Sequence, residues 1–154
     1  MDKIDRLQAE YIDALDRKRM GDWLNTFSSA GSYICQTLES VQAGWDIALI
    51  LDDCRGRLED RVKFVEKIWA GTFQDYQTRH FAQRITCGER ESGIFDVRSN
   101  FSVAFTRCDT GQTGVLATGV YEDVVDLNGS TAQFISKRAV IDAPFLPHYI
   151  VYPL

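Results

Sequence analysis

Hydrophobic residues follow one period in the first half of the chain and a different one in the second half. Apolar residues recur every three or four positions over residues 3–19, and every second position over residues 94–108. The first pattern predicts an amphipathic helix, and the second predicts a strand with one packed face and one wetter face. Helices followed by long antiparallel strands are typical of the α+β class, so we expect an α+β fold.

Three helices are expected in the first half. The first ends at Gly21, and a second, short helix begins with Asp22 as its N-cap. Asp52 and Asp53 start a third helix, where their charge offsets the helix dipole, and Gly71 ends it.

Turn residues separate the expected strands. Two short strands, 33–38 and 48–51, flank a loop at 39–46, and Asn128-Gly129 predicts a two-residue hairpin. The remaining strands are expected over residues 79–87, 94–108, 115–126 and 131–141.

The C-terminal tail and the length of the chain support two further predictions. Residues 143–154 carry all three prolines and are unusually apolar, so we expect this tail to dock on its own sheet or on a partner. A chain of 154 residues without repeats or linkers predicts one domain spanning 1–154.

Charge and hydropathy exclude several classes of protein. The net charge of -5 argues against a nucleic-acid partner, because phosphate binding needs a basic surface. No apolar run reaches the roughly 20 residues of a membrane span, and the start of the chain lacks the apolar core of a secretory signal. We therefore expect a cytoplasmic protein that binds neither nucleic acid nor membrane.

The four cysteines are not spaced for metal binding. Cys35, Cys54, Cys87 and Cys108 form no Cys-x-x-Cys pair, so four free, partly buried thiols are expected. Structural zinc normally needs paired ligand spacing with histidines nearby, which this chain lacks.

The histidine count limits the redox chemistry of the chain. His80 and His148 are its two histidines. A Rieske iron–sulfur centre needs two cysteines and two histidines, and a mononuclear iron site needs two further histidines and a carboxylate. The chain can therefore supply neither of these iron centres, and we expect it to hold no cofactor, no metal and no catalytic residue.

The Arg79-His80 dipeptide has two interpretations. His80 could be an acid–base residue in a cone-shaped pocket, with Asp13, Asp22 or Asp96 nearby. Alternatively, the pair is structural and bonds to loop backbone or to a neighbouring subunit. The structural interpretation is favoured, since a histidine without a visible partner is weak evidence for catalysis.

Charged residues also face each other across the last hairpin. Glu122 and Asp123 are expected opposite Lys137 and Arg138, an arrangement that stabilises a strand pair without forming any site. Arg138 precedes an apolar run, which makes it a candidate for an interface ion pair.

Short motifs along almost the whole chain resemble one known family in their order and spacing. The motifs are Tyr11, Leu15-Asp16, Trp23, Phe27, Tyr33, Asp52-Asp53, Leu58, Arg61-Val62, Trp69, Arg79-His80, Tyr121-Glu122-Asp123, Asn128-Gly129, Lys137-Arg138, Asp142 and Pro153-Leu154. In these positions the chain resembles the small, or beta, subunits of Rieske-type aromatic-ring-hydroxylating dioxygenases. It departs from many members at 76–78, where they have proline before an Arg-x-Arg-His run.

This resemblance implies a fold, and it implies that structural and catalytic functions belong to different subunits. The fold would be a cone-shaped, curved antiparallel sheet packed on N-terminal helices, as in nuclear transport factor 2, ketosteroid isomerase and cystatin-like proteins. The chain would be a non-catalytic structural subunit, assembled with other beta subunits and with a large alpha subunit, usually three of each. The alpha subunit would carry the Rieske 2Fe-2S cluster, the mononuclear Fe(II) and the substrate pocket, with electrons from a reductase or ferredoxin that uses NAD(P)H. The substrate would be an aromatic compound, such as the acids terephthalate or salicylate.

Contacts with partner subunits are expected from a small set of residues. These are Arg79, His80, Arg138, Tyr149, Tyr152 and Leu154. Two alternatives remain on the same cone fold. One is a free-standing isomerase or dehydratase with His80 or a carboxylate at its centre. The other is a ligand-binding module lined by aromatic residues.

Overall fold

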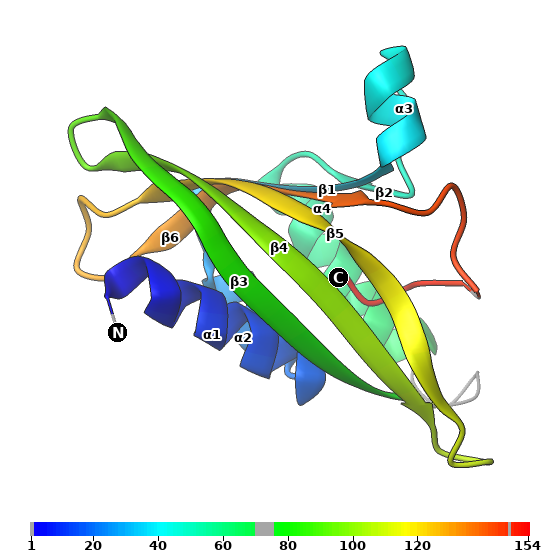
Figure 1. Ribbon diagram of the computed structural model, residues 1–154. Coiled ribbons are helices and arrows are strands. Elements are labelled where there is room, and N and C mark those ends of the chain that lie inside the picture. Colours follow the sequence, from blue (N-terminus) through cyan, green and yellow to red (C-terminus); the bar gives the residue numbers. More distant parts are fainter. Residues whose placement is uncertain (1, 70–75, 148) are drawn as a thin grey trace.

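The computed structural model describes residues 2–69, 76–147 and 149–154, which form a curved six-stranded sheet with helices packed against it (Figure 1). The strand order is β2-β1-β6-β5-β4-β3. The elements are α1 (Lys3–Asp16), α2 (Met20–Asn25), β1 (Phe27–Thr37), α3 (Leu38–Ala43), β2 (Ile50–Asp52), α4 (Arg55–Phe64), the π-helical turn η1 (Val65–Trp69), β3 (Tyr76–Glu91), β4 (Ile94–Arg107), β5 (Thr113–Asp126) and β6 (Gln133–Ile141). The predicted α+β class is confirmed.

The sheet is antiparallel except at one position. β1 and β6 pair in parallel, with Tyr33 opposite Lys137 and Ile34 opposite Arg138. The antiparallel pairing expected for the long strands is confirmed for β3 to β6, and β1 joins this sheet through a parallel pairing that the sequence did not predict. The chain between the two strands builds the rest of the sheet, which is the long crossover that a parallel pair requires.

Helix α1 begins and ends through local hydrogen bonds and backbone geometry. The Asp2 side chain accepts a hydrogen bond from the Asp5 backbone N–H over 2.8 Å and caps the first turn. The helix ends at Asp16, not at Gly21, because Lys18 adopts a left-handed backbone with φ of 56°. Gly21 instead lies inside α2, whose N-cap is Arg19, so the predicted cap at Asp22 is wrong.

Helix α3 occupies most of the segment predicted as a loop at 39–46 and begins one residue before it, at Leu38. The Thr37 hydroxyl accepts a hydrogen bond from the Ser40 backbone N–H over 3.1 Å and caps this helix. Gly44, with φ of 68°, ends it. These two caps stabilise a helix too short for a clear hydrophobic period.

Helix α4 begins later than predicted. Asp52 is the last residue of β2 and receives two hydrogen bonds from the Arg61 guanidinium, at 2.9 and 3.1 Å. The helix itself starts at Arg55. The predicted start at Asp52 and Asp53 is therefore wrong, and the predicted end at Gly71 lies outside the described residues.

The last hairpin is wider than the sequence predicted. Pairing between β5 and β6 ends at Asp126 opposite Gln133, so a two-residue turn at Asn128-Gly129 is wrong. The Asn128 side-chain amide donates to the Ser92 carbonyl over 3.2 Å, which ties this connection to the β3–β4 hairpin.

The core lies between the concave face of the sheet and the helices α1, α2 and α4, which share one side of the sheet (Figure 1). The rings of Trp23 and Phe27 meet edge to face, with centroids 5.0 Å apart. The Leu154 backbone enters this core: its N–H donates to the Tyr33 hydroxyl over 2.9 Å, and its carbonyl accepts from the Tyr11 hydroxyl over 2.7 Å. The predicted docking of the tail on its own chain is confirmed at Leu154. No helix among the described residues has the length and apolar character needed to cross a membrane.

Candidate functional site

His80 on β3 and Asp16 at the end of α1 form a buried pair. His80 Nδ1 lies 2.6 Å from Asp16 Oδ1, and the His80 backbone N–H donates to Asp16 Oδ2 over 3.0 Å. The Thr78 hydroxyl adds a third hydrogen bond to Asp16 Oδ1, at 2.9 Å. One carboxylate thus fixes both the backbone and the ring of the histidine and joins α1 to the edge of the sheet.

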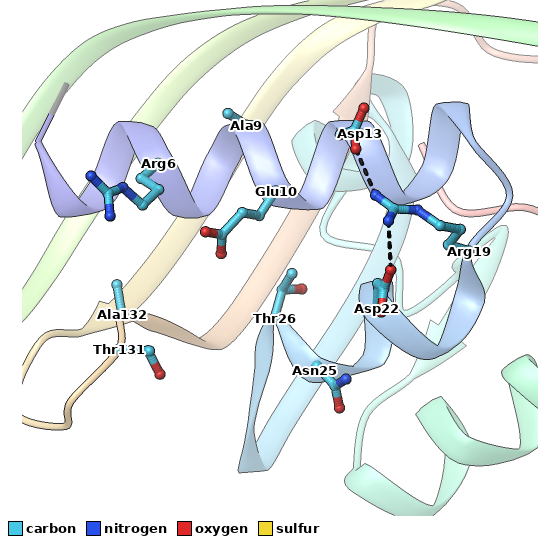
Figure 2. Close-up of a pocket in the computed structure, with 10 residues that line it drawn as sticks. All are labelled: Arg6, Ala9, Glu10, Asp13, Arg19, Asp22, Asn25, Thr26, Thr131 and Ala132. Carbon is cyan, nitrogen blue, oxygen red and sulfur yellow. Dashed lines mark hydrogen bonds and ion pairs between the residues drawn. The ribbon is translucent and has the colours of Figure 1, made fainter.

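The three carboxylates expected near His80 lie elsewhere. Asp13 and Asp22 both pair with the Arg19 guanidinium, at 2.6 and 3.1 Å, and Figure 2 shows these pairs at the rim of a cavity. Asp96 pairs with Arg90 at 2.6 Å. The prediction of Asp13, Asp22 or Asp96 is therefore wrong, because the end of α1 brings Asp16 to β3 instead.

The environment of the His80–Asp16 pair favours a structural role. Burial alone raises the pKa of the Asp16 carboxyl, but the hydrogen bonds and charge of His80 outweigh it and hold the pKa below the ordinary 3.8. The His80 side chain is 2% exposed, and its Nε2 is buried without a hydrogen-bond partner. An acid–base histidine must reach a substrate proton at hydrogen-bond distance. The enclosed Nε2 offers no such access, so the isomerase or dehydratase alternative is not favoured.

A second buried ion pair joins β6 to β5. Lys137 Nζ donates to Asp123 Oδ2 over 2.8 Å and to Gln8 Oε1 on α1 over 3.0 Å. Three aromatic rings surround the ammonium group, with centroids at 3.8, 4.4 and 4.5 Å for Tyr121, Phe134 and Tyr11. The Lys137 and Asp123 side chains are 0% and 1% exposed.

Burial acts on both partners of this pair. Desolvation lowers the pKa of Lys137 and raises that of Asp123, while the attraction between the two charges opposes each shift. The prediction that Glu122 and Asp123 face Lys137 and Arg138 is confirmed, and the strand register puts Asp123 opposite Lys137 and Glu122 opposite Arg138. The sequence did not indicate that the first of these pairs faces the core.

The six residues expected at subunit contacts have different surroundings. Arg79 and Tyr149 are exposed, Arg138 and Tyr152 are partly buried, and His80 and Leu154 are buried within this chain. The Arg138 Nε donates to Glu122 Oε2 over 2.9 Å. The Tyr152 ring meets Tyr76 edge to face, with centroids 6.2 Å apart.

Two cavities border helix α1. The first, of about 610 Å³, lies between α1, α2 and the β5–β6 connection, and half of the residues that line it are charged (Figure 2). The second, which we call the concave cavity, measures about 460 Å³ and lies between α1 and strands β3 to β6. Its lining combines aliphatic side chains with buried Ser99 and Asp123.

One exposed apolar surface was not predicted from the sequence. Four side chains at every second position, here called the 45–51 stripe, are 51%, 60%, 45% and 46% exposed: Trp45, Ile47, Leu49 and Leu51. The strand register continues the stripe across the sheet, with Leu51 beside Ile34 and Ile34 beside Arg138. The alternation of these four apolar residues was a usable signal, but the predicted loop at 39–46 concealed it.

No potential metal site emerges from the part of the chain that the structure describes, where no three His, Cys, Asp or Glu side chains gather around a point. His80 is held by Asp16, and His148 lies outside the described residues. The four cysteines are free thiols: Cys35 is buried, which raises its pKa to about 12, and Cys54, Cys87 and Cys108 are exposed. Partial burial of all four was therefore wrong.

Comparison with known proteins identifies related small subunits. The model of the family described as the ring hydroxylating beta subunit matches residues 11–148. The anthranilate 1,2-dioxygenase small subunit of Burkholderia cepacia is 25% identical over 148 residues, which cover 96% of this chain and 90% of that protein.

Solved structures confirm the fold. A protein described as the beta subunit of an aromatic-ring-hydroxylating dioxygenase from Novosphingobium aromaticivorans superposes with a TM-score of 0.85 and 27% identity, over 97% of this chain and 93% of that chain. The beta subunit of the benzoate 1,2-dioxygenase from Burkholderia mallei gives a TM-score of 0.76 and 21% identity, over 90% of this chain and 88% of that chain. A protein from Nostoc punctiforme with a cystatin-like fold gives a TM-score of 0.65 and 16% identity, over 94% of this chain and 92% of that chain. Because the family model covers most of the chain, the protein belongs to the family of ring-hydroxylating beta subunits, the small subunits of aromatic-ring-hydroxylating dioxygenases, as its resemblance predicted.

Proposed function

We propose that this chain is a structural, non-catalytic subunit, one domain over residues 1–154, that stabilises the large subunit of an aromatic-ring-hydroxylating oxygenase. The observation that carries the proposal is the enclosure of the buried charged groups described above. His80 is committed to Asp16, and Lys137 is committed to Asp123. The large subunit then holds the Rieske 2Fe-2S cluster, the mononuclear Fe(II) and the substrate pocket.

The outer surface supports a role in assembly. Exposed apolar side chains in a row mark protein contacts more often than isolated ones do, and the 45–51 stripe is such a row. We place the large subunit on this stripe and on the adjoining Arg138–Glu122 pair. Arg79 and Tyr149, both exposed, are further candidates for subunit contacts.

The composition of the complex and its substrate belong to the same proposal. Three copies of each subunit would assemble, and a reductase or ferredoxin that uses NAD(P)H would supply electrons in the cytoplasm. An aromatic acid is the proposed substrate class, because the two relatives with 25% and 21% identity are named for anthranilate and benzoate, whereas a structure named for naphthalene is only 15% identical. Terephthalate and salicylate belong to this class.

The test is co-expression of this chain with a tagged large subunit from the same host. We expect the two chains to copurify, iron to be found in the complex, and an aromatic acid to be hydroxylated once reductase is added. The chain purified alone should bind no stoichiometric iron and turn over none of these acids. Iron binding or turnover by the isolated chain, or failure to copurify, would overturn the proposal.

A further inference from the structure

The concave cavity has the size and the walls of a small-molecule site. Its volume of about 460 Å³ lies within the range of roughly 300–1,000 Å³ common for such sites. Aliphatic side chains from helix α1 and from the sheet line it, among them Ile4, Ile12, Val97 and Val125. A molecule in this space would therefore be largely apolar.

Two unpaired polar atoms belong to residues in the wall of this cavity. Asp123 gives one carboxylate oxygen to Lys137, but its Oδ1 is buried and has no partner. Gln8 likewise accepts from Lys137 through Oε1, and its Nε2 is buried and unpaired. Buried polar groups in folded proteins nearly always have hydrogen-bond partners, so an acceptor and a donor left over in the wall of one cavity could both bind a molecule placed in it.

The charges around the cavity favour an uncharged ligand. Lys137 and Asp123 neutralise each other at its inner wall. At its rim Arg84 bonds to Asp2 at 2.7 Å and to Asp5 at 3.2 Å, which gives one positive and two negative charges. An anion would meet this excess of carboxylates, and any ion would lose its hydration, a penalty of several kcal/mol.

We propose that the concave cavity binds a small, uncharged molecule that carries a hydroxyl group on an apolar ring, such as a phenol. The hydroxyl donates to Asp123 Oδ1 and accepts from Gln8 Nε2, and the ring contacts the aliphatic wall. Both atoms are buried, so binding requires the Gln8 side chain, which is partly exposed, to move. This site is independent of the proposed structural role.

The test is titration of the full chain, isotopically labelled for NMR, with phenol, anisole and benzoate. Phenol should cause saturable shifts at the methyl groups of Ile4, Ile12, Val97 and Val125. Anisole lacks the hydroxyl donor and should bind about tenfold more weakly, since one hydrogen bond is worth about that factor. Benzoate should not bind there. Absence of saturable phenol binding, or equal binding of benzoate, would overturn the proposal.

A pair of variants locates the site. Ala82→Phe fills the cavity from strand β3 and should abolish phenol binding. Gln83→Phe, the next residue, points to the opposite face of the strand and should leave binding unchanged. Both positions are exposed, so both variants should fold, which circular dichroism checks. Phenol binding that survives Ala82→Phe contradicts the assignment. Copurification with the large subunit tests the structural role separately.

Discussion

The concave interior and the 45–51 stripe differ in how completely the chain covers its own groups. In the interior, even the charged Lys137 is fully buried and has Asp123 as its partner. On the outer surface, the side chain of Ile47 is 60% exposed although it is apolar. The difference indicates that interior charged residues determine whether the chain folds, and that the 45–51 stripe is available to contact another protein.

The interior is tested most severely by removing Lys137. In Lys137→Ala, Asp123 stays buried without its counter-charge, and loss of one partner of a buried ion pair costs about 3–5 kcal/mol. Urea denaturation of the purified chain would measure this loss of unfolding free energy. A loss below about 1 kcal/mol would contradict the view that the pair holds the interior together.

A double variant separates the charge effect from packing. Lys137→Met combined with Asp123→Leu removes both charges and keeps apolar volume, so it should be clearly more stable than Lys137→Ala. Equal loss in both variants would mean that the shape of the side chains, rather than the unpaired charge, causes the destabilisation.

The interior and the outer surface also differ in how far the sequence predicted them. The sequence predicted that the acidic residues of β5 face the basic residues of β6, but it did not predict the burial of the Asp123–Lys137 pair, because alternation does not tell which face a helix covers. The partner of His80 depended on where α1 ends, and the left-handed backbone at Lys18 decides that. Helix α3 was missed because the side-chain cap at Thr37 stabilises it rather than a hydrophobic period.

The outer surface is tested by Trp45→Ala. Because the side chain is 51% exposed, the unfolding free energy should change by no more than about 0.5 kcal/mol. Aromatic residues at the centre of an interface contribute about 2 kcal/mol or more, so affinity for the large subunit should fall about 30-fold. Gln42→Ala, an exposed change on α3, is the matched control and should leave affinity unchanged. Unaltered affinity in Trp45→Ala would remove the stripe from the interface.

The next largest expected effect is a change in the stability of the interior at acid pH. The pKa of Asp16 is lower in the folded chain than its ordinary 3.8, so the ionised form stabilises the fold above that pH. This stabilisation is lost as the pH falls from about 3.8 through the folded-state pKa. Asp16→Asn should be about 1–2 kcal/mol less stable at pH 7 and should lose less stability on acidification.

The measurement is urea denaturation of both chains from pH 7 to about pH 3, and the difference between their curves isolates the Asp16–His80 pair. Asp2 and Asp109 also have lowered pKa values, but both are present in each chain, so their contributions cancel. Parallel curves for the two chains would show that Asp16 is not the group whose protonation matters.

The smallest effect on folding is expected where the outer surface carries charge. Arg138 and Glu122 are 40% and 43% exposed, so solvent screens their attraction, and Arg138→Ala should cost at most about 1 kcal/mol. Arg138 also adjoins Ile34 and, through it, the 45–51 stripe. If the large subunit covers this region, the pair loses its water in the complex, and Arg138→Ala should weaken assembly more than it weakens folding. A double-mutant cycle with Glu122→Ala, run for unfolding and for binding, compares the two coupling energies. Equal coupling in both experiments would place the pair outside the interface and confine the contact to the apolar side chains.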